Sequence, residues 1–216
     1  RRQAEAERER LMLAIEQEYD ELDMAIRMFQ NTMMRARYSS IPVVVAPHSL
    51  ALGGACELSL HADKVCPAAE TYIGLVELGV GLIPGGGGLT YIARRAAENA
   101  AAVPGSDLLA AVAGGFQAAA MAKVGTSALE SRQLGYLLWS DVIVAHKDEL
   151  LQVALDEVKA MSTAGWRAPM KRSFAVAGRS GKATIQAQLL GMRDGGFSSA
   201  HDFHIASLIA DVVCGG

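Results

Sequence analysis

The sequence predicts an α/β fold with mostly parallel strand pairing, and three patterns predict it. Helical and extended segments alternate through the first half of the chain, as they do where helices connect parallel strands. Residues 43–46 form a short apolar, β-branched run, typical of a strand that is buried on both faces. The second half, from residue 107 onward, has the patterning of a layer of helices.

Composition indicates a globular protein with a sizeable core. The chain has 216 residues, of which 51% are hydrophobic and 20% charged, proportions that disordered chains do not have. The net charge of −3 gives no reason to expect nucleic acid or an anionic membrane as a partner. No apolar run reaches the roughly 20 residues that a membrane span needs.

The cysteines and the chain start bear on location. Cys56, Cys66 and Cys214 are scattered and form no CxxC pair, so we expect free thiols in a reducing compartment, which means the cytoplasm. Residues 1–10 are charged and lack the apolar core of a secretory signal. Because the chain begins with Arg rather than Met, we expect it to be a piece of a longer polypeptide.

The first half predicts two helices and three extended segments. The charged residues 1–20 predict a solvated helix or a frayed arm. After them, apolar residues recur at spacings of four, three and four, at Leu22, Ile26, Phe29 and Met33. This apolar stripe predicts a helix that ends near Tyr38. Residues 39–42 break this helix, 43–46 form a strand, and 47–49 form a turn. A second helix comes next over about 56–62, then a strand over 63–66, and a loop over 67–90 that includes an extended segment at 72–74.

The second half predicts mainly helices. One covers 107–122, and Ser127 with Glu130 fits a capping box that opens another, which ends near Gly135. A last strand is expected over 141–144. An amphipathic helix over 148–161 presents one apolar face, made of Leu151, Ala154, Leu155, Val158 and Met161. Two more helical stretches cover 185–192 and 203–213.

Two glutamates, 20 residues apart, stand beside glycine-rich stretches. Glu57 comes after Gly53 and Gly54, and Glu77 precedes the four glycines at 85–88. Glycine lets a backbone N–H approach a ligand, and a helix N-terminus that opens in glycines can stabilise a developing oxyanion. Two carboxylates beside such a backbone suit proton transfer around a carbonyl. The alternative is a tight strand–helix turn with Glu57 on the solvent face.

Nucleotide-phosphate motifs are not matched. The stretch that begins Gly79-Val80-Gly81 departs from G-x-G-x-x-G at its last position, and no Lys-Ser or Lys-Thr comes after either glycine run, which argues against a dinucleotide site and a P-loop.

These segments together resemble the crotonase (enoyl-CoA hydratase/isomerase) family. The resemblance lies in residues 51–58 with Ala62-Asp63, in 72–77, and in 81–88, and it covers roughly residues 20–216. Segments 166–169 and 176–179 and the end at 210–216 are similar to a bacterial subgroup in which a 3-hydroxyacyl-CoA dehydrogenase region precedes the crotonase region.

The resemblance implies a crotonase-like (ClpP/crotonase) spiral β/α core, lacking its N-terminal part, with a helical C-terminal region. Residues 1–106 would be the partial core with a leading helix, and 107–216 the helical oligomerisation region. It implies an acyl-CoA thioester as substrate and a homo-oligomer, a trimer or a hexamer, as the assembly. It implies no cofactor in this region, since NAD would serve only the upstream dehydrogenase, and no metal.

The resemblance also implies roles for residues. Gly54 matches the position whose N–H forms one half of the oxyanion hole, and Glu57 and Glu77 match the two catalytic glutamates of the hydratases. The substrate-binding positions would be Leu52, Gly53, Pro84 and Gly85. Because family isomerases often carry only one of the two glutamates, the presence of both favours hydration of a trans-2-enoyl-CoA in fatty-acid β-oxidation.

The chain departs from the family pattern at three points. His48-Ser49 stands where Asn-Gly is common, and Val76 stands where many hydratases have Pro. No motif for the second oxyanion donor occurs in residues 1–40. We therefore expect half an oxyanion hole, and weak activity or none in the 216-residue chain alone.

Two other functions stay open, an enoyl-CoA isomerase and a non-catalytic CoA-binding or assembly module. Several side chains also have two readings. His201 and His204 have the spacing of a metal pair, but a surface helix is the simpler interpretation. Cys56 is interpreted as core filler rather than a reactive thiol. Basic pairs could contact a CoA phosphate or lie on a solvated face, namely Arg94 with Arg95 and Lys171 with Arg172.

Overall fold

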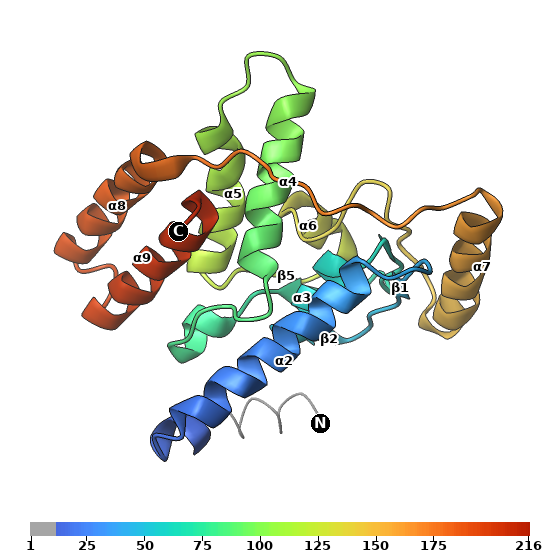
Figure 1. Cartoon of the computed structure of the whole chain (residues 1–216), viewed down its shortest axis with the longest axis horizontal. Helices are drawn as coiled ribbons and strands as arrows, with labels where there is room; N and C mark the ends of the chain where they lie inside the picture. The colour runs from blue at the N-terminus through green and yellow to red at the C-terminus, as the bar shows by residue number, and fades with distance from the viewer. Residues whose placement is uncertain (1–11) are drawn as a thin grey trace.

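The computed structural model describes residues 12–216, so most of the arm expected over residues 1–20 lies outside the described residues. In chain order the elements (Figure 1) are α2 (Tyr19–Arg37), β1 (Val44–Val45), β2 (Leu50–Leu52), α3 (Gly54–His61), β3 (Lys64–Val65), β4 (Tyr72–Gly74), the 3-10 turn η1 (Glu77–Val80), α4 (Gly88–Ala102), α5 (Leu108–Ala120), β5 (Val124–Gly125), α6 (Ala128–Gln133), the 3-10 turn η2 (Lys147–Glu149), α7 (Leu150–Thr163), α8 (Gly178–Asp194) and α9 (Ala200–Cys214).

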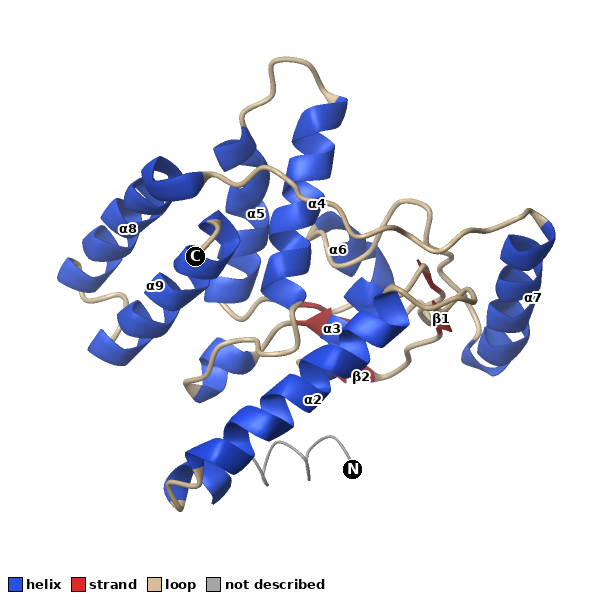
Figure 2. Ribbon diagram, viewed as in Figure 1, coloured by secondary structure: helices blue, strands red, loops and turns tan. Residues whose placement is uncertain are grey.

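The strands form two small sheets amid the helices (Figure 2). β1 pairs with β3 in parallel, and β4 lies between β2, which is parallel to it, and β5, which is antiparallel. In the β2–β4 pair Leu50 lies opposite Tyr72 and Leu52 opposite Gly74. This register brings the ends of β2 and β4 to the same edge of the sheet, where α3 and η1 begin.

Most helices share one hydrophobic core. That core includes buried residues from α3, β4, α4, α5, α8 and α9, among them Ile73, Leu75 and Ile209, each with no exposed surface. Residues on both sides of position 106 therefore pack into a single cluster. In Figure 1, α4 and α5 stand in the middle of the molecule with α8 and α9 beside them and α2 across the front.

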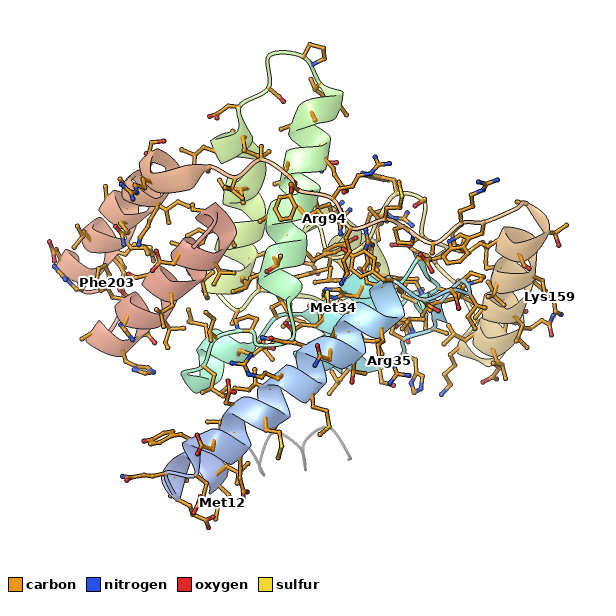
Figure 3. The ribbon with its side chains drawn as sticks, viewed as in Figure 1. Met12, Met34, Arg35, Arg94, Lys159 and Phe203 are labelled. Atoms are coloured by element: carbon orange, nitrogen blue, oxygen red, sulfur yellow. The ribbon has the colours of Figure 1, made fainter. Side chains whose placement is uncertain are left out.

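Helix α7 packs apart from this core. It contacts β1, and its buried residues Leu150 and Ala154 belong to a second, smaller cluster with Cys66, Ala68 and Val144. An extended segment over residues 164–177 leads from α7 back across the molecule to α8 (Figure 1). Lys159 of α7 and Phe203 of α9 lie at opposite ends of the molecule (Figure 3).

Several sequence predictions hold with small shifts. The helices expected from residue 22 to Tyr38, over 56–62, over 107–122 and over 203–213 correspond to α2, α3, α5 and α9. The extended segment expected at 72–74 is β4, and the parallel pairing holds for β1–β3 and β2–β4. The strand expected at 43–46 is present as β1, but its residues are only half-buried rather than buried on both faces.

Other predictions are wrong or incomplete. The strand expected over 141–144 is replaced by an irregular segment whose Val144 forms an isolated bridge with Ala68. Strands β2 and β5 and helix α4 were not predicted, because two- and three-residue strands carry too little pattern and α4 begins at Gly88, inside a glycine run that predicts a loop.

The predicted apolar face of α7 is only partly right. Ala154 is buried and Val158 and Met161 are half-buried, but Leu151 and Leu155 are exposed. Leu150 is buried instead, because the small cluster meets the helix slightly away from the face that periodicity selects. The capping box of α6 is half formed. Ser127 Oγ accepts from Glu130 N–H, but the Glu130 carboxylate accepts from Thr126 rather than from Ser127.

The described residues contain no helix long and apolar enough to cross a membrane. Within that same part of the chain, no group of three or more His, Cys, Asp or Glu side chains is placed to hold a metal ion.

Candidate active site

The site is built on two neighbouring parallel strands. The chain leaves β2 at Leu52 and enters α3, whose first turn carries Glu57. It leaves β4 at Gly74 and enters η1, whose first residue is Glu77. Adjacent strands lie about 4.8 Å apart. The segments that carry Glu57 and Glu77 therefore begin at neighbouring points on the same edge of the sheet.

The turn between β2 and α3 ties the two segments together. Gly53 N–H donates to Gly74 C=O at 2.9 Å, and Gly53 C=O accepts from Glu57 N–H at 2.9 Å. Gly53 has φ 56° and ψ −125°, a conformation open to glycine and strained for other residues. Gly54, the first residue of α3, is one of the four positions whose N–H has no acceptor within the helix.

The Glu57 carboxylate is buried and held by backbone amides. Its side chain is only 1% exposed. Gly86 N–H donates to both of its oxygens, at 2.8 and 2.9 Å, and Gly88 N–H donates to Oε1 at 2.9 Å. Gly88 opens α4, so the carboxylate also faces the positive end of that helix dipole. Both features stabilise the ionised carboxylate. The alternative expectation of Glu57 on a solvent face is wrong.

Glycine is required in the run that holds Glu57. A Cβ on Gly86 would clash with the Glu57 carboxylate and lie 2.5 Å from Phe29 Cε1, and one on Gly88 would lie 3.0 Å from Glu57 Cγ. The edge of the Phe29 ring, from α2, therefore lies beside the carboxylate. Gln30 of the same helix donates to Gly85 C=O at 2.9 Å, which fastens α2 to the glycine run.

The Cys56 thiol is affected by the negative charges of both carboxylates. The side chain has no exposed surface. Burial raises the pKa of the Cys56 thiol well above its ordinary value, and the negative charges of Glu77 and then Glu57 raise it further. Both acidic groups are thus close enough to act on one sulfur atom. With a thiol held protonated in this way, the interpretation of Cys56 as core filler is supported over a reactive nucleophile.

Tyr136 stands behind the Glu77 segment. Its hydroxyl donates to Lys123 C=O at 2.9 Å. Burial raises the pKa of the Tyr136 hydroxyl, Cys56 and Glu77 raise it further, and a hydrogen bond from the Leu75 backbone opposes the shift. The hydroxyl therefore anchors the chain two residues before Glu77.

His61 stands one turn after Glu57 on α3. Its Nδ1 donates to the Glu57 backbone carbonyl at 2.7 Å. Burial lowers the pKa of His61, the bond to Glu57 opposes that shift, and the positive charges of Arg37 and Arg94 add to it. The imidazole is therefore neutral at pH 7, with its proton on Nδ1.

The remaining candidates lie around this centre. Gly53 and Pro84 are buried, whereas Leu52, Gly54 and Gly85 are partly exposed. Glu77 is partly exposed as well. Gly85 adjoins Gly86, which binds Glu57, and Leu52 lies opposite Gly74, which leads to Glu77. Leu52 and Gly85 thus adjoin residues that position the two acids, Gly53 accepts from Glu57 N–H, and Pro84 comes two residues before Gly86.

The basic candidates are occupied by protein groups. Arg95 donates to Gly135 C=O and Leu137 C=O. Arg94 contacts the Tyr38 hydroxyl at 3.1 Å and Glu98 at 3.2 Å. Lys171 lies 5.4 Å from the Tyr38 ring centroid. These contacts favour structural roles for Arg94, Arg95 and Lys171, whereas Arg172 is exposed.

Sequence reasoning missed Gly86 and Gly88 as partners of Glu57, and Phe29, His61 and Tyr136 as its surroundings. The run of four glycines before a helix was the available signal for the first two, because such a run exposes consecutive N–H groups. Phe29 and Tyr136 carried no signal, since each has the spacing of an ordinary core residue.

The sequence matches a known family. The sequence model described as "Enoyl-CoA hydratase/isomerase" matches residues 12–126, just over half of the chain. A Bacillus subtilis (strain 168) protein named "Probable 3-hydroxyacyl-CoA dehydrogenase" is 39% identical over 211 residues, which cover 95% of this chain and 26% of that protein. The "Fatty acid oxidation complex subunit alpha" of Shewanella amazonensis (strain ATCC BAA-1098 / SB2B) is 44% identical over 57 residues, 26% of this chain and 8% of that protein. The chain thus spans about a quarter or less of the curated relatives described here.

Solved structures show the fold. An enoyl-CoA hydratase from Polaromonas sp. JS666 matches with a TM-score of 0.56 at 18% identity, over 94% of this chain and 66% of that one. One from Bacillus anthracis matches with a TM-score of 0.52 at 21% identity, over 88% and 60%. The α/β prediction is confirmed in the specific form of the crotonase fold. With this fold and the match over residues 12–126, the chain belongs to the enoyl-CoA hydratase/isomerase family.

Proposed function

We propose that the chain is the enoyl-CoA hydratase portion of a fatty-acid β-oxidation enzyme, which adds water across trans-2-enoyl-CoA to give 3-hydroxyacyl-CoA. The observation that carries the proposal is the placement of Glu57 and Glu77. Both glutamates come shortly after strands that pair with each other. Burial raises the pKa of the Cys56 thiol, and the negative charges of both glutamates raise it further. Family membership and the names of the relatives support the same reaction.

The chemistry assigns each acid a role. Glu57, stabilised as an anion by Gly86 and Gly88, takes a proton from water as the water oxygen bonds to C3. The electrons of the C2–C3 double bond move into the thioester, whose oxygen accepts a hydrogen bond from Gly54 N–H. Glu77, in its protonated form, then delivers a proton to C2. Leu52, Gly53, Pro84 and Gly85 form the walls of the substrate site.

The proposed reaction requires that substrate and water reach the Glu57 carboxylate. Glu57 is 1% exposed, with Phe29 beside it. Substrate and water would therefore reach this carboxylate by displacing the Phe29 ring.

The proposal extends to the longer polypeptide of which this chain would be a part. We propose that this chain is the C-terminal part of a cytoplasmic fusion protein. The missing N-terminal part of the crotonase core would precede it and supply the other oxyanion donor, and an NAD-dependent 3-hydroxyacyl-CoA dehydrogenase would lie further upstream. The extent of the B. subtilis match supports this. Residues 1–106 would be the core portion and 107–216 the helical region that forms a trimer or hexamer. The substrate region would need neither cofactor nor metal.

The test is crotonyl-CoA hydration by the full-length protein, monitored as loss of absorbance of the conjugated double bond. Glu57→Gln and Glu77→Gln should each lower kcat by about 10²–10⁴-fold, the usual worth of general acid–base catalysis. Glu70→Gln, at an exposed glutamate before β4, is the matched control and should leave kcat unchanged. The 216-residue chain alone should turn over weakly or not at all.

A non-catalytic module is the second candidate, and one observation favours it. Three hydrogen bonds from the start of α4 are also what a purely structural carboxylate would make. Unchanged hydration in Glu57→Gln would establish that role. Incubation with 3-enoyl-CoA distinguishes an isomerase from a hydratase. If the protein moves the double bond in preference to hydrating it, the isomerase assignment replaces the hydratase one.

A further inference from the structure

A histidine of the C-terminal helix contacts the segment that carries Glu77. We propose that His201 is a positioning residue, which holds Glu77 in its catalytic orientation through the Gly81–Leu82 peptide. This inference rests on the proposed hydratase function. His201 is exposed and lies in the first turn of α9, 120 residues from the peptide it contacts.

The contact has a defined direction. His201 Nε2 lies 2.9 Å from Gly81 O. A carbonyl oxygen only accepts, so Nε2 carries the proton and donates. The ring packs directly on the glycine, since a Cβ on Gly81 would lie 3.1 Å from Nε2. Gly81 has φ +79°, so glycine suits this position on conformational grounds as well.

One rigid plane connects His201 to Glu77. Gly81 C=O and Leu82 N–H belong to the same peptide unit, which is planar. His201 holds the oxygen side of this plane. On the other side, Leu82 N–H donates to the Glu77 backbone carbonyl at 3.0 Å. Displacement of the peptide therefore displaces the backbone of Glu77.

The two ends of this connection differ in rigidity. Helix α9 begins with a capping box formed by Ser199 and Asp202 and buries Ile205 and Ile209 in the main core. η1 is a four-residue 3-10 turn with no fully buried residue, and short 3-10 turns have poorer hydrogen-bond geometry than α-helices. The helix can thus act as a fixed support, while the turn contributes the partly buried Leu78 to the core but no fully buried side chain.

The test compares three variants of the full-length protein. His201→Ala removes the donor, His201→Gln keeps an N–H donor at similar reach, and His204→Ala removes an exposed histidine on the same helix. In crotonyl-CoA hydration we expect His201→Ala to lower kcat about fivefold to tenfold, the worth of one hydrogen bond, with KM changed less than twofold. His201→Gln should recover most of kcat, and His204→Ala should match the wild type.

Either of two results would overturn the inference while the proposed function stands. One is a His201→Ala kcat within twofold of His204→Ala, and the other is a His201→Gln variant as slow as His201→Ala.

A readout without substrate separates this inference from the proposed function. Native-state hydrogen exchange of the Leu82 amide should be about fivefold faster in His201→Ala than in His204→Ala, because the peptide loses its support. If the wild-type protein does not hydrate crotonyl-CoA, the hydratase proposal and the catalytic part of this inference both fail. Equal exchange in the two variants would refute the support itself, whatever the activity.

Discussion

In the proposed hydratase, Glu57 would combine a structural and a chemical task in one side chain. The hydrogen bonds that favour its ionised form come from Gly86 and Gly88, and the same bonds satisfy N–H groups at the start of α4, which lack helical acceptors. A carboxylate used in this way is pre-oriented before substrate arrives, so little reorganisation remains for the reaction. The same close packing makes the position of the Glu57 carboxylate sensitive to any atom added at these glycines.

Substitution of Gly86 tests that sensitivity. Gly86→Ala would push a methyl group into the Glu57 carboxylate and the Phe29 ring. We expect a loss of about 1–3 kcal/mol in the free energy of unfolding, as for other overpacked sites, together with lower hydratase kcat. The measurements are the midpoint of urea unfolding and the rate of crotonyl-CoA hydration.

Gly85→Ala is the matched stability control. The nearest atom to an added Cβ there is Ile83 O at 4.0 Å, so the unfolding midpoint should hardly move. Equal destabilisation by the two alanines would contradict the packing described around Glu57.

At this scale the sequence singled out Glu57 and Glu77 as candidates but did not predict how their side chains are held. Glu57 and Glu77 stand out because acidic residues beside glycines are unusual. The amide donors of Glu57 could not be predicted, because an N–H has no side-chain signature and its direction depends on backbone angles such as φ +97° at Gly87. The burial of Glu57 was missed for the same reason.

Among the elements, the turn before β2 stores strain. Ser49 has φ 59°, in the left-handed region that costs most residues about 1–2 kcal/mol. The pair His48-Ser49 is the departure from the expected Asn-Gly pattern, and the structure gives that departure a physical meaning. Ser49 C=O accepts from Tyr72 N–H at 2.8 Å, so the turn is held in place by the first residue of β4.

Ser49→Gly should relieve this strain. After allowance for the greater freedom of glycine in the unfolded chain, about 0.4–1 kcal/mol, we expect a net gain of up to about 1 kcal/mol in the free energy of unfolding. Ser40→Gly, in the preceding loop and without positive φ, should instead lower it. Urea unfolding of both variants is the measurement, and a loss of stability in Ser49→Gly would show that the turn is not strained.

The long helices α2 and α9 were well predicted because they offer several turns of periodic pattern, whereas α4, of similar length, was missed because it opens in glycines. β2 and β5 were missed since strands of two or three residues are held by their neighbours rather than by their own residues. The face of α7 was only partly predicted because its small cluster with Cys66 and Val144 is set by segments distant in sequence.

At the scale of the whole molecule, residues 12–216 form a large core and a small one. Cys56 and Cys214 belong to the large cluster, and Cys66 belongs to the small cluster under α7. Burial raises the pKa of all three thiols, that of Cys66 to about 11. Each is therefore protonated at pH 8 and slow to react with alkylating reagents while buried.

This arrangement predicts the order in which the thiols become reactive. With iodoacetamide at pH 8 in rising urea, Cys66 should be alkylated at a lower concentration than Cys56 and Cys214, because fewer apolar contacts hold the small cluster. Peptide mass spectrometry after brief labelling gives the extent at each thiol. Simultaneous labelling of all three would mean that the two clusters unfold as one unit.

The register of β2 against β4 has a consequence for how such genes diverge. Each residue inserted into a strand end displaces the next part of the chain by about 3.3 Å, so a length change between Leu52 and Glu57, or between Gly74 and Glu77, would separate the two acids. The exposed connection over residues 103–107 carries no such constraint. Insertions and deletions inherited by descendants of this chain should accumulate there and be purged from the two short spacers.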